Sequence, residues 1–173
     1  MKTEEKTMNY YNGIASGYKN LYHEEQKLKI SLILDYLPNT GNLLDLGCGD
    51  GVLNQFISND VELFSLDLSS ELLKLNSNSE PHKFCASILD IPFSDKKFDF
   101  ISSFTVFQDL PDVKCGINET LRVLKDDGTF VLSFLHMARD CSLLLELIHS
   151  KFEIVFETKE IKDYIFVLKK KLD

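Results

Sequence analysis

Apolar and polar positions in the first forty residues alternate with the period of a helix. A helix is predicted from about Ile14 to Leu37, with a break near Gly17. Its apolar positions recur at helical spacing, at Leu21, Leu28, Leu32 and Ile33. The segment Pro-Asn-Thr-Gly at 38–41 cannot continue a helix, so the chain is expected to leave it there.

After residue 41 the pattern changes to short apolar runs separated by turn residues. Strands are predicted at 42–46, 61–66, 82–85, 98–103, 129–135, 152–157 and 164–169, the last two as a hairpin. Helices are predicted at 52–57, 71–76, 112–124 and 141–149, and Asp126-Asp127-Gly128 is expected to turn the chain. Alternating strands and helices predict right-handed crossovers and a parallel sheet that is covered on both faces.

The most informative segment is LLDLGCGDG at residues 43–51. It predicts a buried strand, then a tight turn in which alternate glycines let backbone amides approach a ligand of nucleotide type. A dinucleotide fingerprint would read G-x-G-x-x-G, whereas the spacing here is G-x-G-x-G. Asp45 at the strand end is poorly placed beside a pyrophosphate, so a cationic amine or sulfonium is the better guest.

Two further acids follow predicted strands. Asp67 ends the second strand and can accept both hydroxyl groups of a ribose, although a solvated acid at a strand end is the plain alternative. Asp90, followed by Ile91, suits an adenine edge, with an ordinary turn aspartate as its rival. Brändén's rule places the ligand beyond the carboxyl ends of the strands.

Five segments, in order, resemble the motifs of class I S-adenosylmethionine-dependent methyltransferases. They are LLDLGCGDG at 43–51, SLDLS at 65–69, SILDIPF at 87–93, FDFISSFTVFQDLPD at 98–112 and LRVLKDDGTFVLSF at 121–134. The opening at 10–18 also resembles the lead-in of small-molecule and ubiquinone-type methyltransferases. The resemblance implies an α/β fold of three layers, Rossmann-like, with a mostly parallel seven-stranded sheet in the order 3-2-1-4-5-7-6 and the last strand antiparallel.

The same resemblance implies one methyltransferase domain over residues 1–173, in which a helical N-terminal lid (1–40) covers a cofactor-binding core (41–173). The cofactor would be S-adenosylmethionine and the product S-adenosylhomocysteine. Implied contacts are Asp45, Gly47, Cys48 and Gly49 to the methionine part, Asp67 to the ribose, Leu68, Asp90 and Ile91 to the adenine, Ser103 and Phe104 beside the sulfonium, and Tyr10, Tyr11 and Tyr18 over the cofactor.

The methyl acceptor is less well indicated. The chain has Ser103-Phe104-Thr105-Val106 where adenine and glutamine methyltransferases carry N/D-P-P-Y/F, which disfavours those acceptors. A short C-terminal hairpin favours a small molecule. Two alternatives stay open, a cofactor-binding subunit that needs a partner for catalysis and methylation of a protein or RNA, while loop spacing disfavours a nicotinamide-dependent dehydrogenase. Candidate bases are Asp109, His136 and His23, each with a plain structural alternative as a helix cap, a loop residue or a surface residue.

Composition narrows the picture further. The 173 residues carry a net charge of −8, which makes a nucleic-acid partner unlikely on charge alone. The four cysteines form no C-x-x-C pair, so neither a metal site nor a disulfide framework is expected. No secretory signal or membrane-spanning run is present, which predicts a cytoplasmic protein. An oligomer or a partner protein stays possible.

Overall fold

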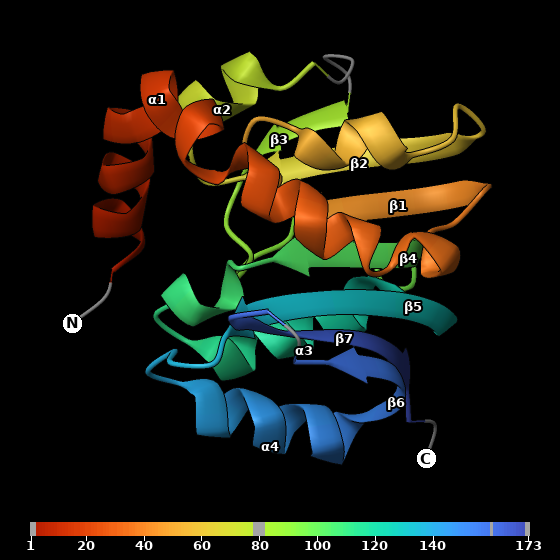
Figure 1. The fold of residues 1–173 in the computed structure, drawn as a ribbon. Helices are drawn as coiled ribbons and strands as arrows, with labels where there is room; N and C mark the ends of the chain where they lie inside the picture. The colour runs from red at the N-terminus through yellow and green to blue at the C-terminus, as the bar shows by residue number, and fades with distance from the viewer. Residues whose placement is uncertain (1–2, 78–81, 160, 172–173) are drawn as a thin grey trace.

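A mixed β-sheet forms the centre of the molecule. The computed structural model describes residues 3–77, 82–159 and 161–171, and within them seven strands lie in the order β3-β2-β1-β4-β5-β7-β6 (Figure 1). The strands are β1 Gly41–Leu46, β2 Val61–Asp67, β3 Lys83–Cys85, β4 Phe98–Phe104, β5 Leu124–Leu135, β6 Phe152–Thr158 and β7 Asp163–Lys170. β7 is antiparallel to β5 and β6, and β1 to β5 pair in parallel. The predicted order and the antiparallel last strand are confirmed.

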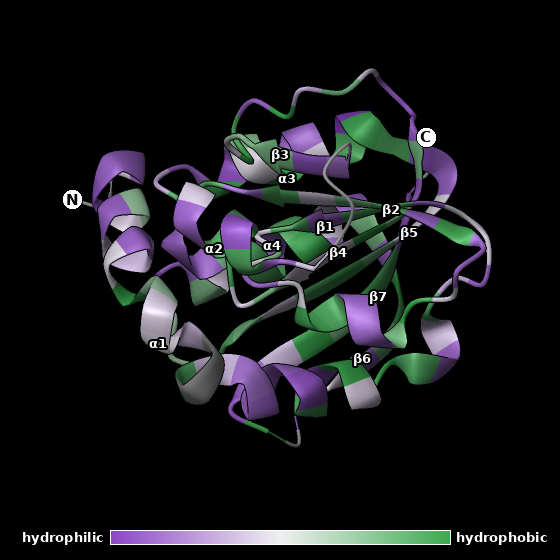
Figure 2. Ribbon diagram, turned by 90° about the horizontal axis from the view of Figure 1, so that it is seen from above, coloured by the Kyte–Doolittle hydropathy of each residue, from purple (hydrophilic) through white to green (hydrophobic). Residues whose placement is uncertain are grey.

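Helices cover both faces of this sheet. They are α1 Glu4–Ser31, α2 Ser70–Leu75, α3 Val113–Val123 and α4 Cys141–Lys151, with the 3-10 turns η1 Leu34–Tyr36, η2 Val52–Phe56 and η4 Phe107–Asp109. The second half of α1 and η2 pack on one face, while α3 and α4 pack on the other. Seen from above, the mostly apolar strands run between these layers (Figure 2). The predicted three-layer Rossmann-like arrangement is therefore correct.

The strands are apolar on both faces because each face is covered by helices. In β1, Leu43 packs under α1 and Leu44 packs toward α3, since successive side chains of a strand point to opposite faces. Phe100 and Ile101 of β4 divide in the same way. This explains why the middle strands read as continuous apolar runs and why their register is fixed.

Helix α1 begins earlier and ends earlier than predicted. Its first residue is Glu4 and not Ile14, because the Thr3 hydroxyl caps it by accepting from the Lys6 amide at 3.3 Å and Glu4 and Glu5 favour its first turn. It ends at Ser31, and the η1 turn replaces the predicted last turns. The chain stays helical through Gly17, where a break was expected. The helix changes direction along its length, and its first half (red) lies beyond the carboxyl ends of the strands (Figure 1).

The predicted turn at 126–128 is not a separate connection. β5 follows α3 directly at Leu124, and the register against β4 shifts between Phe98, which pairs with Leu124, and Phe100, which pairs with Thr129. The intervening residues form an irregularity within the strand. The Asp-Asp-Gly segment therefore forms an irregularity within a longer strand and not a turn between two elements.

Candidate active site

A cavity of about 380 Å³ lies between α1 and the carboxyl ends of the parallel strands. Its volume falls in the range of ligand pockets, roughly 300–1,000 Å³. It lies where the topology of an open α/β sheet places ligands. Eight of the sequence-predicted site residues line it, namely Tyr10, Tyr11, Tyr18, Gly47, Asp67, Leu68, Phe104 and Asp109.

One face of α1 supplies many further lining residues. Sequence reasoning missed Glu4, Thr7, Tyr22, Glu25 and Gln26, which line the cavity together with Tyr11 and Tyr18. Their positions recur every three or four residues, or at multiples of a turn, so they share one side of the helix. The Thr3 cap and the Glu-Glu pair after it were the signals that would have extended the predicted helix to include Glu4 and Thr7.

Asp67 is held rigidly at the end of β2. The backbone N–H groups of Gly49 and Ser69 each donate to its carboxylate at 2.8 Å, and the side chain is only 8% exposed. Burial raises the pKa of Asp67, while these backbone hydrogen bonds oppose the increase. Since a carboxylate has about four acceptor sites, Asp67 keeps the capacity to accept from hydroxyl groups in the cavity.

The glycine loop differs from the expectation that its amides face a ligand. The N–H groups of Gly47 and Cys48 both donate to the Leu66 carbonyl, at 2.7 and 3.1 Å, and that of Gly51 donates to the Cys48 carbonyl. Glycine is needed at 47 because φ is +71° and a Cβ would lie 2.4 Å from Val106 Cγ2. Because these amides are used within the protein, the loop does not offer the anion cradle that a pyrophosphate needs.

A second, smaller cavity of about 30 Å³ adjoins the first and shares Tyr18, Gln26, Gly47 and Phe104 with it. The predicted residues Asp45, Cys48 and His23 line this space. Two of its lining residues pair with each other: His23 Nε2 lies 3.2 Å from Asp50 Oδ2, so α1 contacts the glycine loop. A space of this size holds about one water molecule.

Asp45 lies at the floor of the smaller cavity. Its side chain accepts a hydrogen bond from the Ser102 hydroxyl at 2.8 Å and is 4% exposed. Burial raises the pKa of Asp45 to about 7, the charge of Asp67 adds to the increase, and the Ser102 hydrogen bond opposes it. A cation placed beside Asp45 would stabilise its ionised form.

Five predicted residues line neither cavity. Gly49 contributes its amide to Asp67 and lies against Tyr18, with a hypothetical Cβ 3.2 Å from the ring. Ser103 is buried and donates to the Leu46 carbonyl at 3.0 Å. His136 packs against Tyr164, with ring centroids 4.4 Å apart. Asp90 is exposed and Ile91 is buried in the core, while Ser87 and Ile88, which sequence reasoning missed, line the cavity in their place.

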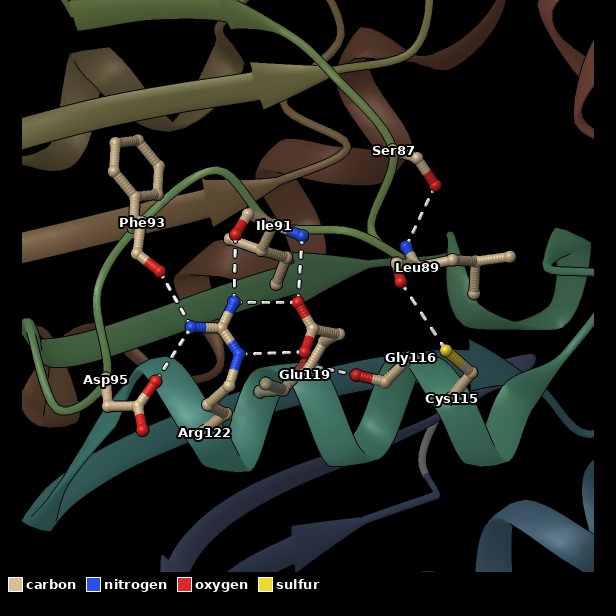
Figure 3. A network of polar contacts seen from close by, with 10 residues as sticks. Ser87, Leu89, Ile91, Phe93, Asp95, Cys115, Gly116, Glu119 and Arg122 are labelled. Atoms are coloured by element: carbon tan, nitrogen blue, oxygen red, sulfur yellow. Dashed lines mark hydrogen bonds and ion pairs between the residues drawn. The ribbon is translucent and has the colours of Figure 1, made fainter.

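The segment 87–93 is fixed by α3 (Figure 3). The guanidinium of Arg122 donates to the carbonyls of Ile91 at 2.9 Å and Phe93 at 2.7 Å, and it pairs with both carboxylate oxygens of Glu119. Glu119 in turn accepts from the Ile91 amide at 2.9 Å. These bonds hold the Ile91 and Phe93 end of the segment, and at its other end the Ser87 hydroxyl donates to Glu4 of α1.

A charge cluster, buried at Lys29 and Asp163, joins α1 to β7 at another side of the cavity. Lys29 Nζ lies 2.8 Å from Glu25 Oε1 and 2.9 Å from Asp163 Oδ2, and Lys162 Nζ lies 2.6 Å from Glu25 Oε2. Burial works against ionisation of Glu25, but the hydrogen bonds from Lys162 and Lys29 outweigh it and lower its pKa. Two ammonium groups and two carboxylates therefore balance one another here.

Four tyrosines of α1 form a continuous aromatic cluster at the cavity. Ring centroids are 5.2 Å apart for Tyr10 and Tyr11, 6.2 Å for Tyr11 and Tyr18, and 5.0 Å for Tyr18 and Tyr22. The Tyr11 hydroxyl donates to Asp109 Oδ2 at 3.1 Å and so bridges α1 and η4. Burial raises the pKa of Tyr11 and Tyr18 well above the usual value, which keeps both phenols neutral at physiological pH.

The described helices include none with the length and apolar character needed to cross a bilayer. The family model described as a methyltransferase domain matches residues 44–132, just over half of the chain. An uncharacterized protein of Methanocaldococcus jannaschii, MJ0638, is 33% identical over 158 residues, which cover 90% of this chain. The chain spans 66% of that relative's length and 49% of the length of a second relative from the same organism.

Solved structures share the fold. A chain from the complex between the Haloferax volcanii Trm112 methyltransferase activator and a methyltransferase superposes with a TM-score of 0.76 at 15% identity, with 99% of both chains covered. A S-adenosylmethionine-dependent methyltransferase from Aquifex aeolicus superposes with a TM-score of 0.70 at 15% identity, covering 89% of this chain and 97% of that one. The ordered motifs, the sheet order and the matching family model agree: the chain belongs to the methyltransferase-domain family (methyltransferase type 11), and its fold is that of class I S-adenosylmethionine-dependent methyltransferases.

Proposed function

We propose that this chain binds S-adenosylmethionine in the cavity under α1 and transfers its methyl group to a small-molecule acceptor. The observation that carries the proposal is the position of Asp67, a buried carboxylate that lines the cavity and is oriented by the Gly49 and Ser69 amides. When bound, the cofactor supplies an activated methyl group on a cationic sulfur.

The residues of the site fit such a guest. Asp67 accepts from the ribose hydroxyls, and the Ser87–Ile88 segment and Leu68 border the adenine. Asp45 and Gly47 border the methionine part, for which α1 must move away from the loop because the space there is about 30 Å³. The acids near the loop favour a cation, and the internally bonded loop amides disfavour a pyrophosphate. Alignment of the acceptor and exclusion of water by α1 are then the chain's main contributions to rate.

A small acceptor is supported by the position of α1 over the cavity. The first half of α1 covers it, with Tyr11 joined to Asp109 across the gap. A volume of about 380 Å³ lies at the low end for ligand pockets, roughly 300–1,000 Å³.

Isothermal titration with S-adenosylhomocysteine tests the cofactor site. Wild-type protein is expected to bind it, and Asp67→Ala is expected to weaken binding by more than ~1 kcal/mol, as loss of hydrogen bonds to a charged group does. Asp60→Ala, which removes an exposed acid near the start of the same strand, is the matched control and should leave the affinity unchanged. No binding by the wild-type chain, or equal affinity for Asp67→Ala, would refute the assignment.

A second candidate is a subunit whose turnover depends on a partner protein. The likeness in fold to the Haloferax volcanii chain, which comes from a complex with a methyltransferase activator, supports it. Cofactor binding by the isolated chain with turnover only after a partner is added would favour this arrangement. Turnover by the isolated chain would exclude it.

A further inference from the structure

We propose that the methyl acceptor is a small amine, held between the tyrosines of α1 and the carboxylate of Asp109. This inference rests on the proposed function and names the substrate class for the same cavity.

The cavity is acidic. Among the described residues, the charged side chains that line it are Glu4, Glu25, Asp67, Asp109 and Lys162. Lys162 is paired with Glu25, and Lys29 behind it is paired with Glu25 and Asp163, so this cluster is neutral as a whole. The other acidic side chains that line the cavity are Glu4, Asp67 and Asp109, while the bound cofactor carries one net positive charge. A second cation is therefore favoured in the cavity, and an anionic acceptor is opposed.

The tyrosines suit the same kind of guest. Tyr11 is in contact with Tyr10 and Tyr18, and its hydroxyl donates to Asp109, so aromatic rings and a carboxylate meet at one place. Tyr22 extends the cluster to the side of Glu25, which also lines the cavity. An aromatic ring attracts an ammonium group through its quadrupole, and the attraction is larger where water is excluded.

The lining residues allow amine chemistry and do not favour acid chemistry. A phenol or carbon acid reacts as an anion and needs a cation beside it, but the single lysine among the described lining residues is paired with Glu25. An amine binds as the ammonium ion and loses a proton, through Asp109, to water. Its nitrogen lone pair then forms the C–N bond as the C–S bond breaks, and the sulfur keeps the electron pair of that bond.

Three probes of nearly equal shape test the inference on the full chain loaded with S-adenosylhomocysteine. Tetramethylammonium, neopentyl alcohol and pivalate carry charges of plus one, zero and minus one. Binding is followed by tyrosine fluorescence, which is unobscured because the chain has no tryptophan. Tetramethylammonium is expected to bind at least about ten-fold more tightly than the alcohol, with pivalate weakest. Equal or tighter binding of the alcohol or pivalate would overturn the inference.

Two substitutions that change the charge of the cavity in opposite directions locate the bound cation. Asp109→Asn keeps the side-chain shape and should weaken tetramethylammonium binding about five-fold, whereas Asp60→Asn should not change it. Lys162→Gln, at an exposed side chain, should tighten it, and this variant serves if Asp109→Asn does not fold. Unchanged probe affinity in the folded variants contradicts the inference. Binding of S-adenosylhomocysteine is measured first. A failure of the cofactor site is therefore distinguished from a failure of the amine site.

Discussion

Lys29 Nζ lies 2.9 Å from Asp163 Oδ2, and both side chains are fully buried. The pair connects α1 to the first residue of β7, next to the cavity. Thr105, the residue directly after β4, accepts from Lys29 and donates to Asp163 at 3.1 Å. The N-terminal helix is thus anchored to the sheet by a buried ion pair in addition to apolar packing.

Lys29→Met is expected to destabilise the protein strongly. Removing one partner of a buried ion pair leaves an uncompensated charge, which costs about 3–5 kcal/mol. Urea unfolding measures the loss. Lys27→Met, on the same helix but in a partly exposed pair with Glu24, should cost less than about 1 kcal/mol.

A double-mutant cycle with Asp163→Asn tests whether the two side chains act as a pair. The double variant should lose clearly less stability than the sum of the single variants, because neither charge is then left alone. Additive losses would show that the pair does not hold α1 in place.

We expect the ionisation of Asp45 to lower the free energy of unfolding as pH rises. Its pKa is about 7 in the folded chain, against 3.8 as the ordinary value, so between about pH 4 and 7 the native state binds more protons than the unfolded state. The contribution of Asp45 to stability is therefore complete below that window and is lost through it, at up to about 1.4 kcal/mol per pH unit.

Urea unfolding of Asp45→Asn across pH 4 to 8 checks this dependence. The stability of the variant relative to wild type should increase through the window. Ser102→Ala, which removes the hydrogen bond that favours the ionised form, should move the wild-type transition to higher pH. A constant difference between Asp45→Asn and wild type at every pH would contradict the assignment.

Two glycine substitutions should have opposite effects. Gly13 lies within α1 with no atom within 4 Å of a hypothetical Cβ, so Gly13→Ala should stabilise by up to about 1 kcal/mol through helix propensity. Gly41 has a φ of +91° and a Cβ there would lie 2.8 Å from Asp99 Oδ2, so Gly41→Ala should destabilise by about 1–3 kcal/mol. Thermal unfolding measures the stability of both variants. A loss of stability in Gly13→Ala would contradict the helical position of Gly13.

Arg122→Gln should loosen the 87–93 segment and weaken cofactor binding. The substitution removes hydrogen bonds to the carbonyls of Ile91 and Phe93, worth roughly 1–3 kcal/mol for a charged donor. Hydrogen exchange at the Ile91 amide should accelerate, and the affinity for S-adenosylhomocysteine should fall several-fold. Arg139→Gln, in an exposed pair with Asp140, is the control and should change neither measurement.

Sequence periodicity was sufficient to predict the strands, because the signals that favour a strand are local. Apolar runs such as Leu43-Leu44 and the glycine loop after them depend on neighbouring residues, and the ordered motifs then implied the strand order that the structure confirms. The resemblance to the methyltransferases implied that Asp67 and the α1 tyrosines lie at one site, and all of them line the larger cavity. The start of α1 was missed because the cap at Thr3 precedes any apolar repeat.

Contacts between distant segments were decided only by the tertiary structure. The sequence alone determined the elements, the family resemblance and most of the acids near the loop, since these follow from spacing along the chain. Which acid is buried beside Lys29, why Ser87 and not Asp90 lines the cavity, and where the loop amides donate depend on how α1, α3 and the sheet pack together. Burial and hydrogen-bond partners are properties of that packing, and no single segment encodes them.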